Sequence, residues 1–505
     1  MKLLTAAEMR EVDRRTIEAG IPGLILMENA GSRAVDFLLA TFAPLSTHHV
    51  VVVCGKGNNA GDGFVIARQL FTRKLCRRLT VLELFDQSSL SGDAAANRRM
   101  LAACGCQVVT ELPDESACAT IVVDAILGTG LSGPVKEGPA LDGIRLVNQK
   151  FPLAIKVAVD IPSGLPSDQN TPTGEFVHAD HTVTFVAPKI GNLPSFSVAP
   201  IGTPSQFYET NSDLRLNLTS PADIAFLFSE RPRDSNKGLY GHVLVVGGSF
   251  GKSGAPAMSG VSAYRSGAGL VTVALPKSAL LAVAAVRPEL MTEPLAETPS
   301  GRLASAETPR LLELAGKMTV LALGPGLGTE DETAHLVTSL YEQVEIPTVV
   351  DADALNVLAG RLPHTARIRI LTPHPGEMSR LTGTSVKQLQ ADRRGSAQRF
   401  AALSGATVVL KGDLTVIAFP DGETWINPTG SPSMATGGTG DILTGMIAGL
   451  VAQHPHEWKR AAIAAVWLHG RCGELGARHW GQESMLATDL LDFLPKAIDE
   501  VRPAL

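Results

Sequence analysis

Short apolar runs alternate with glycine-rich turns and amphipathic stretches through the first half of the chain. The apolar runs have the length of buried strands, and the amphipathic stretches have helical spacing. Such an alternation predicts a parallel sheet flanked by helices. The predicted strands lie at residues 50–53, 121–123, 154–159 and 182–187, and the predicted helices lie at residues 5–19, at 24–39 and from about 61.

The second half repeats this alternation. A segment rich in Pro, Ser, Thr and Asn at residues 195–220 interrupts the pattern. We therefore predict two domains, at residues 1–218 and 226–505. In the second, strands are predicted at 241–247, 319–323, 347–350, 367–371 and 407–410, the last in a hairpin with 414–419, and helices at 255–266, from about 375, from about 439, at 458–480 and at 486–497.

Composition agrees with two packed domains and excludes several classes of protein. The chain has 505 residues, too many for one core, with 45% hydrophobic and 19% charged residues. A net charge of −6 with interspersed signs argues against binding to nucleic acid or to an anionic membrane. No apolar run reaches the ~18 residues of a membrane span. The six cysteines lack metal-binding spacing, so we predict buried, reduced thiols and a cytoplasmic protein.

The first predicted strand leads into the turn G-K-G-N-N-A-G-D, which opens a helix. Gly55, Gly57 and Ala60 fit the weak G-x-G-x-x-[G/A] pattern of a dinucleotide-binding oxidoreductase, with Glu83 as the ribose-binding acid. That pattern does not explain the amides and the carboxylate of residues 58, 59 and 62. These oxygen-bearing side chains favour a site for a polar ligand or a cation.

Two further strands of the first half end in aspartate. Asp124 opens D-A-I-L-G-T-G-L-S-G-P, and Asp160 opens D-I-P-S-G-L. Open α/β sheets bind ligands at the carboxyl ends of their strands. A lone aspartate there is often only a turn former, but three oxygen-rich strand ends together predict a site.

The second half contains a glycine-rich loop, M-A-T-G-G-T-G-D, that leads directly into an apolar helix. Backbone N–H groups of such a loop and of the helix start form a site for phosphate. Asp441 follows immediately and could accept a proton from a substrate hydroxyl. Lys411 at a strand end and His374 with Glu377 complete a set that resembles the ribokinase-type alcohol kinases. The alternative is a simple turn, in which Asp441 only interacts favourably with the helix dipole.

Together the motifs resemble the bifunctional enzymes that repair hydrated nicotinamide nucleotides. The first half resembles the NAD(P)H-hydrate epimerases in V-C-G-K-G-N-N-A-G-D-G-F-V-I-A-R, V-D-A-I-L-G-T-G-L and V-D-I-P-S-G. The second resembles the NAD(P)H-hydrate dehydratases in G-S-x-G-K-S-G-A, S-G-A-G-L-V, G-P-G-L-G, D-A-D-A-L, T-P-H-P-G-E, L-K-G and M-A-T-G-G-T-G-D-I-L. The resemblance implies a Rossmann-like three-layer α/β/α domain followed by a ribokinase-like α/β domain.

The resemblance also implies two reactions and their residues. The first domain would interconvert the R and S hydrates of NADH and NADPH at C6, and the second would dehydrate the S epimer with ADP. The epimerase substrate site would comprise Asn58, Asn59, Ala60, Gly61, Asp62, Gly128, Thr129, Gly130, Leu131, Ser132, Gly133, Pro134 and Asp160, with Asp160 as acid–base residue. Asn59, Asp124 and Ser163 would hold K⁺.

In the second domain, Gly326, His374 and Asp441 would contact the hydrate, with Asp441 as the base. The ADP site would comprise Lys411, Gly412, Asp413, Leu414, Thr415, Gly437, Gly438, Thr439 and Gly440, with Mg²⁺ on the phosphates. The resemblance implies these small molecules as partners, without nucleic acid or membrane, and we expect a homo-oligomer.

The chain departs from the family pattern in two places. Ala60 replaces a usual glycine and fits only if its φ is negative. Ser431 and Ser433 replace a usual Asn and Gly before the glycine loop. Two rival functions stay open: a small-alcohol kinase fused to a Rossmann-type ligand-binding domain, and a first half that binds ligand without catalysis.

Overall fold

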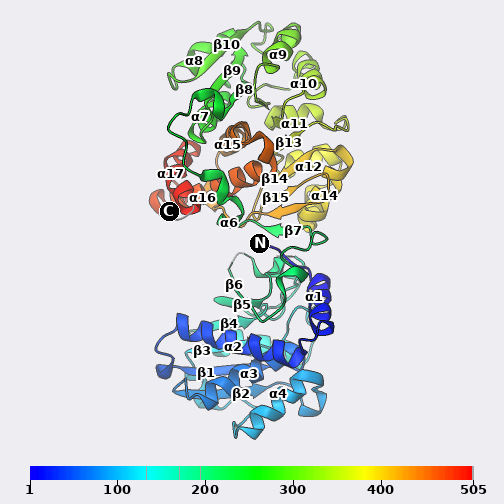
Figure 1. Cartoon of the computed structure of the whole chain (residues 1–505), viewed down its shortest axis with the longest axis vertical. Coiled ribbons are helices and arrows are strands. Elements are labelled where there is room, and N and C mark those ends of the chain that lie inside the picture. Colours follow the sequence, from blue (N-terminus) through cyan, green and yellow to red (C-terminus); the bar gives the residue numbers. More distant parts are fainter. Residues whose placement is uncertain (132, 170, 194, 503–505) are drawn as a thin grey trace. The chain divides into compact units, whose positions relative to one another are not determined.

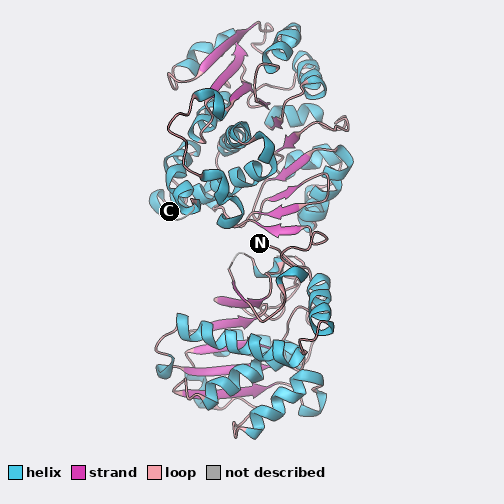
Figure 2. Ribbon diagram, viewed as in Figure 1, coloured by secondary structure: helices cyan, strands magenta, loops and turns pink. Residues whose placement is uncertain are grey.

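The computed structural model describes residues 1–131, 133–169, 171–193 and 195–502. Contacts within the chain separate two compact units, Met1–Leu214 and Arg215–Leu505. In each unit helices lie against a central sheet (Figure 1, Figure 2), so the predicted two-domain α/β class is confirmed. The sequence placed residues 216–218 in the first domain. In the structure they form strand β7 (Leu216–Leu218), which belongs to the second unit and pairs there with β16 (Thr424–Ile426).

In the described part of the first unit, six strands form one sheet in the order β2-β1-β3-β4-β5-β6, and every pair is parallel. The strands are β1 (His49–Cys54), β2 (Arg78–Glu83), β3 (Ile121–Ala125), β4 (Ile155–Val159), β5 (His181–Phe185) and β6 (Ser197–Ala199). The helices are α1 (Ala6–Glu18), α2 (Gly23–Thr41), α3 (Asn58–Thr72), α4 (Gly92–Ala103) and α5 (Pro139–Lys150).

Strand β1 explains why this unit has three layers. All of its residues are buried, and alternate side chains point to opposite faces of the sheet. Val50 and Val52 belong to the core that includes residues of α2 and α3. Val51 and Val53 belong to a second core that includes residues of α5. A strand buried on both faces reads as a continuous apolar run, which is why the sequence revealed it.

The described part of the second unit has a ten-stranded sheet in the order β10-β9-β8-β11-β12-β13-β14-β15-β16-β7. Its pairs are parallel except around β15, which is antiparallel to both neighbours as the predicted hairpin requires. The remaining strands are β8 (His242–Val246), β9 (Leu270–Pro276), β10 (Met291–Leu295), β11 (Val320–Leu323), β12 (Thr348–Val350), β13 (Arg369–Leu371), β14 (Thr407–Leu410) and β15 (Val416–Ala418).

Helices again line both faces of this sheet, over two separate cores. One core includes residues of α7, α15, α16 and α17, and the other includes residues of α9, α10 and α11. The helices are α6 (Pro221–Ile224), α7 (Gly254–Arg265), α8 (Leu280–Ala284), α9 (Thr308–Ala315), α10 (Asp331–Gln343), α11 (Ala352–Leu358), α12 (Pro375–Thr382), α13 (Val386–Ala391), α14 (Arg393–Ser404), α15 (Thr439–Gln453), α16 (Trp458–Trp480) and α17 (Leu490–Val501).

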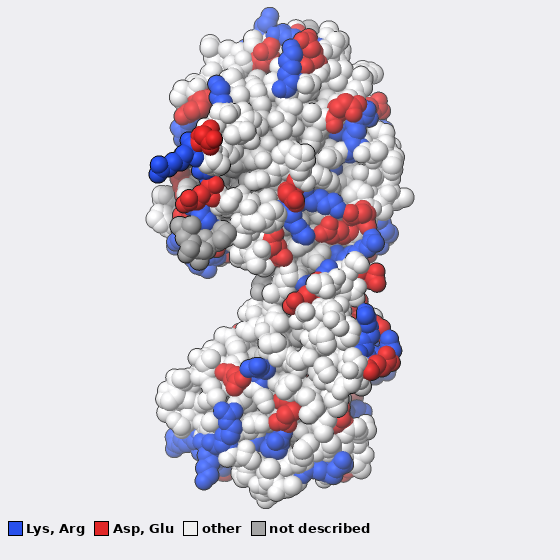
Figure 3. Space-filling model, in the orientation of Figure 1, with Lys and Arg blue, Asp and Glu red and all other residues white. Residues whose placement is uncertain are grey.

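The structure corrects two expectations, the start of the last helix and the burial of the cysteines. The last helix begins at Leu490 instead of residue 486, because a 3₁₀ turn at Ala487–Asp489 precedes it. All six cysteines are free, but only Cys54, Cys106 and Cys472 are buried as predicted. Cys76 is half-buried, and Cys104, which follows the end of α4, and Cys118, at the end of a 3₁₀ turn, are exposed. Acidic and basic side chains are interspersed on the visible face of both units (Figure 3). No helix in the described ranges is long and apolar enough to cross a membrane.

Candidate active sites

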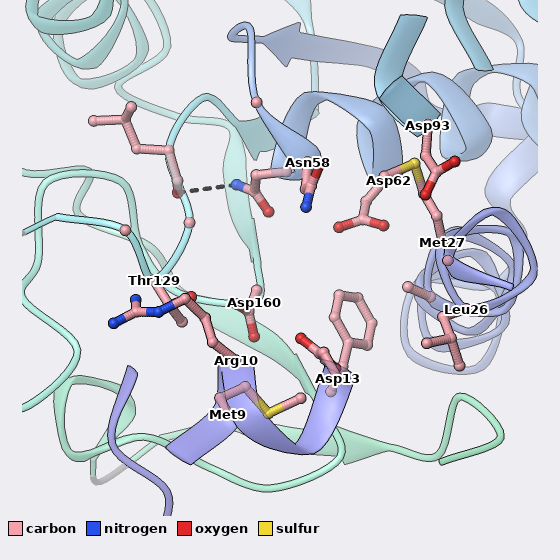
Figure 4. A pocket seen from close by; sticks show the side chains of 18 of the residues that line it. Met9, Arg10, Asp13, Leu26, Met27, Asn58, Asp62, Asp93, Thr129 and Asp160 are labelled. Carbon is pink, nitrogen blue, oxygen red and sulfur yellow. Dashed lines mark hydrogen bonds between the residues drawn. The ribbon is translucent and has the colours of Figure 1, made fainter. Parts of the chain in front are cut away.

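A cavity of about 560 Å³ lies at the carboxyl ends of strands β1, β3 and β4 in the first unit. Residues from the loops after these strands, from α1, α2 and α3, and from the segment after β5 line it (Figure 4). Asp13, Asp62 and Asp160 point into it, from three different elements (Figure 4). The structure therefore brings together the strand-end motifs that the sequence singled out.

The polar residues of the first glycine-rich turn lie on a helix. Helix α3 begins at Asn58, three residues earlier than predicted, because Gly57 takes the N-cap position. Ala60 therefore lies in the first turn, where φ is negative, and its side chain is fully buried, so the alanine fits. Asp62 lies in the next turn and faces the cavity. Burial raises the pKa of its carboxyl well above the usual range, and the charges of Asp160 and Asp13 add to the increase.

The loop after β3 forms another wall of the cavity. Gly128, Thr129, Gly130 and Leu131 line it, as predicted for the substrate site. Gly133 and Pro134 are not among the lining residues. Ser132 lies outside the described residues. Two of these four residues are glycines, so backbone forms part of this wall.

Asn59, Asp124 and Ser163 meet behind this loop and around the backbone of Leu127. The Ser163 hydroxyl donates to Asp124 Oδ1 at 2.5 Å, and the Ser163 backbone N–H donates to Asp124 Oδ2 at 2.8 Å. Asn59 Nδ2 donates to the Leu127 carbonyl at 2.9 Å. Burial raises the pKa of Asp124 to about 6, against the hydrogen bonds from Ser163.

The amide oxygen of Asn59 is the informative atom of this cluster. It is buried and has no hydrogen-bond partner among the described residues. A buried acceptor without a donor is costly and calls for an unseen partner. Carboxylate, amide and hydroxyl oxygens are the ligands of a hard cation. The cluster therefore fits the K⁺ that the family resemblance implies.

Asp160 directly follows β4 and is held by buried groups. Its Oδ1 accepts from Lys189 Nζ at 2.5 Å and from the Thr184 hydroxyl at 3.0 Å. Its φ of 66° is unusual for a residue other than glycine, although aspartate tolerates it better than most. Such backbone is common at functional sites. Among the described residues no hydrogen bond reaches Oδ2, which leaves that oxygen for a ligand.

The sequence predicted the helix at residues 5–19 but not that this helix and Lys189 contribute to the cavity. The Lys189 side chain is only 1% exposed and forms an ion pair with Asp160. Helix α1 contributes Met9, Asp13 and Ile17, spaced four residues apart on one face. The signal available in the sequence was an aspartate within an otherwise apolar helix face. Burial raises the pKa of Asp13 to about 6, while Lys189 lowers it.

Glu83 does not belong to this site. It ends β2, is buried, and forms an ion pair with Arg98 at 3.2 Å between Oε2 and Nε. It is not among the cavity-lining residues. The alternative in which Glu83 binds the ribose of a dinucleotide is therefore not supported.

In the second unit, Asp441 is the third residue of α15. Gly438 takes the N-cap position with φ of 97°, a conformation that favours glycine. The N–H groups at the start of the helix are thus presented beside Asp441. Burial raises the pKa of Asp441 to about 7, and the charge of Asp351 adds to this, while Lys411 opposes it. A carboxyl that titrates near neutrality beside an anion site is suited to general base catalysis.

Lys411 follows β14 and lies against the start of α15. A Cβ atom added to Gly440 would lie 3.2 Å from Lys411 Nζ, so the ammonium nearly touches the glycine backbone. Nζ donates to Asp351 Oδ1 at 2.9 Å and lies 3.9 Å from Glu377 Oε2. The Lys411 side chain is 21% exposed. The structure thus joins Lys411, the glycine loop and Asp441 in one site.

His374 caps α12, and Glu377 completes the cap. The ring Nδ1 accepts from the Gly376 backbone N–H at 3.0 Å, and Glu377 Oε2 accepts from the His374 backbone N–H at 2.8 Å. The side chain is 52% exposed, and its other nitrogen, Nε2, lies 3.5 Å from Glu377 Oε1. Burial raises the pKa of Glu377 to about 7, although Lys411 lowers it.

Gly326 lies after β11, in the loop opposite the segment after β8. Its φ is 69°, and an added Cβ would come within 2.8 Å of the Lys252 carbonyl oxygen. Its own carbonyl accepts from the Ser249 hydroxyl at 2.8 Å. Glycine is therefore required here by both conformation and close packing.

The Lys411–Thr415 loop depends on a residue that the sequence analysis missed. Arg393 of α14 donates to the carbonyls of Leu410 and Lys411 at 3.1 and 3.2 Å. The Thr415 hydroxyl donates to the Gly412 carbonyl at 2.9 Å and closes the loop. Burial lowers the pKa of Arg393. Nothing in the local pattern around Arg393 announces this contact, because it joins a helix to a strand end.

Comparisons with known proteins match both units. Residues 23–191 match the family described as YjeF-related protein N-terminus, and residues 243–496 match the family described as NAD(P)H-hydrate dehydratase. The first match begins after α1, so Asp13 lies outside it. The bifunctional NAD(P)H-hydrate repair enzyme Nnr of Moorella thermoacetica is 42% identical over 98% of this chain and 96% of its own length. The enzyme of the same name from Coxiella burnetii is 38% identical over 96% and 97%.

Solved structures match the second unit. The ADP/ATP-dependent NAD(P)H-hydrate dehydratase from Bacillus subtilis, co-crystallised with ATP/Mg²⁺, is 34% identical with a TM-score of 0.50. The match covers 57% of this chain and 99% of that one. A ribokinase-like superfamily protein from Enterococcus faecalis is 29% identical, also with a TM-score of 0.50, over 57% and 96%. The predicted ribokinase-like fold is thus confirmed.

Proposed function

The chain belongs to the family of the bifunctional NAD(P)H-hydrate repair enzymes, and from this we propose how its residues carry out the two reactions. The enzyme interconverts the R and S hydrates of NADH and NADPH at C6. It then dehydrates the S epimer to the intact nucleotide while ADP becomes AMP and phosphate. The observation that carries our assignment of residues is the meeting of Asp441, Lys411 and the glycine-rich helix start in one site.

Asp441 is the base of the dehydratase. Its carboxylate takes the proton of the C6 hydroxyl, and the hydroxyl oxygen attacks the terminal phosphoryl group of ADP. The bond from that phosphorus to the bridging oxygen breaks, and AMP leaves. The C6–O bond of the phosphate ester then breaks, driven by the ring-nitrogen lone pair, and loss of a proton from C5 restores the dihydropyridine. A kinase would stop at the ester; the ring nitrogen makes elimination follow.

The chain's own residues provide the charge that phosphoryl transfer needs. Lys411 and the N–H groups of Gly437–Gly440 lie where negative charge develops. The Lys411–Thr415 loop, closed by Thr415 and Arg393, binds the nucleotide beside them. Gly326 and the exposed ring of His374 contact the hydrate. Mg²⁺ on the phosphates would neutralise further charge.

Asp160 is the acid–base residue of the epimerase. Inversion at C6 requires that a bond at this carbon break and re-form, and a proton must leave and return at the C6 hydroxyl. Lys189 and Thr184 hold Oδ1, so Oδ2 faces the substrate. The substrate site around it is formed by residues that line the cavity: Asn58, Asn59, Asp62, Gly128–Leu131 and Asp160. Ala60 and Gly61, which the resemblance also implies, are not among the lining residues.

Asn59, Asp124 and Ser163 would hold K⁺ beside this cavity. Bound there, the cation would supply positive charge that steadies the loop after β3. Titration with KCl should raise the thermal unfolding temperature of the full chain and speed conversion of the R hydrate. LiCl at equal ionic strength is the control, because the smaller cation fits the ligands poorly. Equal responses to both salts would remove the K⁺ site.

The decisive experiment is turnover of racemic NADH hydrate by the full chain. With ADP, we expect the absorbance of NADH to return for the whole racemate. If conversion stops once the S epimer is consumed, the first unit does not catalyse epimerisation and only binds a ligand. Consumption of nucleotide with accumulation of a stable phosphate ester would instead support the rival alcohol kinase.

Two expectations from the sequence stay predictions. Sedimentation of the full chain measures whether it is a homo-oligomer. Fractionation of cells that express it, with an antibody against the chain, measures whether it is cytoplasmic.

A further inference from the structure

Asp351 lies at the centre of the dehydratase site, although the proposed reaction gives it no role. It follows β12, and its side chain is nearly inaccessible to solvent. Its Oδ1 accepts from Lys411 Nζ at 2.9 Å, and its Oδ2 accepts from the Thr444 hydroxyl at 2.8 Å. Thr444 belongs to α15, one turn beyond Asp441. One carboxylate therefore joins the end of β14 to the helix that bears the base.

The surroundings of Asp351 suit a residue that holds its neighbours in place. Its side chain is only 1% exposed, and both of its oxygens accept hydrogen bonds from protein side chains. Burial alone would raise the pKa of Asp351, but the Lys411 ammonium and the hydrogen bonds from Lys411 and Thr444 hold it below its usual range. The charged form of Asp351 is therefore favoured in this site.

The same contacts fix the position of Lys411. An ammonium on a four-carbon chain has many rotamers, and holding it in one of them requires a partner. Asp351 holds it where a Cβ on Gly440 would be 3.2 Å from Nζ and 3.7 Å from Asp351 Oδ2. The pair thus sits directly against the first turn of α15. Nothing else among the described residues bonds to both Lys411 and α15 through one side chain.

We propose that Asp351 is the positioning residue of the dehydratase site, which aims the Lys411 ammonium at the phosphoryl group and ties it to the helix that carries Asp441. This proposal rests on the proposed dehydratase function. Asp351 touches neither substrate nor nucleotide; it acts through Lys411 and Thr444.

The ion pair also acts electrostatically on Asp441. Four charged groups face Asp441 from three elements: Asp351 and Asp353 after β12, Glu377 on α12 and Lys411 after β14. Asp351 raises the pKa of Asp441 more than either other carboxylate, and Lys411 lowers it. The two members of the ion pair therefore shift the pKa of Asp441 in opposite directions.

Two variants of the full chain test this through the pH dependence of kcat for the S hydrate at saturating ADP. Asp351→Asn removes a negative charge, so the midpoint of the profile should move to lower pH. Lys411→Met removes a positive charge, so the midpoint should move to higher pH. Both should lower kcat, Asp351→Asn by about tenfold to a hundredfold, because a donor that stabilises the transferring phosphoryl group is no longer aimed at it.

Asp353→Asn is the matched control, since Asp353 lies two residues further on and bonds to Lys252 and Gly328 instead of Lys411. Asp353→Asn should move the midpoint of the kcat–pH profile in the same direction as Asp351→Asn, but by a smaller amount. Equal shifts for the two aspartates, or midpoints of Asp351→Asn and Lys411→Met that do not separate, would overturn the proposal. If the wild-type chain does not dehydrate the hydrate, the proposed function fails instead.

Thr444→Val covers the case in which Asp351→Asn does not fold. It removes only the hydrogen bond to Oδ2 and keeps every charge. We expect kcat to fall several-fold with the pH midpoint unmoved, and Thr444→Ser to restore kcat, because the serine hydroxyl can donate to the same oxygen. A Thr444→Val enzyme with wild-type kcat would also refute the proposal.

Discussion

The two units place a carboxyl near the start of a helix that follows a glycine-rich turn, yet the two helix starts present opposite chemistry. In the first unit α3 begins with Asn58 and Asn59, the Asn59 amide reaches across to the Leu127 carbonyl, and Asp62 comes only at the fifth helical position. In the second unit α15 begins with Thr439 and Gly440, which leave the backbone N–H groups open, and Asp441 is the third residue.

This difference explains why one helix start fits a cation and the other fits an anion. In the first unit the unpaired atom is the buried amide oxygen of Asn59, in the cluster that Asn59 forms with Asp124 and Ser163 around Leu127. In the second unit the N–H groups at the helix start have no side-chain cap and lie beside the ammonium of Lys411. Side chains, more than the strand–turn–helix frame, decide the ligand.

Asp441→Asn should give the largest effect and should separate the two units. The amide cannot take the hydroxyl proton, so conversion of both epimers to NADH should fall by about 10²–10⁴-fold. Epimerisation of the hydrate, followed by chromatography of the two epimers, should stay at the wild-type rate. Thermal unfolding checks that the fold is intact. Retained dehydration would remove Asp441 as the base.

Asp160→Asn should impair the reaction of the first unit and leave that of the second unchanged. Conversion of purified R hydrate should slow by about 10²-fold, because the acid–base group is lost, while the S hydrate should react at the wild-type rate. Both are measured by the return of NADH absorbance with ADP. The matched control is Asp168→Asn, a carboxylate of the same unit that accepts from the Ala6 backbone N–H and does not line the cavity. A variant that converts R hydrate normally would assign the proton transfer elsewhere.

The pH dependence of dehydration is a smaller effect, and it tests the role of Asp441 in the second unit. Burial raises the pKa of Asp441 to about 7, so the base is protonated and inactive at lower pH. The kcat for the S hydrate should therefore rise about tenfold per pH unit below about 7 and level off above it. The measurement is a pH series with saturating ADP and purified S hydrate. A rate that is flat from about pH 5 to pH 8 would contradict this assignment.

The sequence could predict what lies at the ends of buried strands. Asp124, Asp160 and Lys411 each end or follow an apolar run, and parallel strands bring such ends together at one edge of the sheet. The start of α15 was likewise predicted at Thr439, because a glycine turn meets an apolar helix there. The start of α3 was predicted three residues late, since two asparagines hide the helical pattern.

Contacts between distant segments could not be predicted in this way. Asp351 and Lys411 are 60 positions apart, and they meet because β12, β13 and β14 are neighbours in the sheet. Asp13 reaches the cavity of the first unit from α1, and Arg393 reaches the Lys411–Thr415 loop from α14. Local periodicity carries no information about which strand or helix a segment will lie beside.

Ser431→Ala should have the smallest effect and tests how the loop before α15 tolerates its unusual sequence. The Ser431 hydroxyl accepts from the Ser433 backbone N–H at 3.3 Å and from the Ser433 hydroxyl at 2.9 Å, so it caps the 3₁₀ turn at Pro432–Met434 as an asparagine would. Its loss should cost about 1 kcal/mol of stability and raise the KM for ADP modestly, with R-to-S epimerisation unchanged. Ser431→Asn, which restores a capping side chain, should behave as wild type. A loss of epimerisation in Ser431→Ala would show that the two sites are coupled, and the comparison of two independent helix starts would then fail.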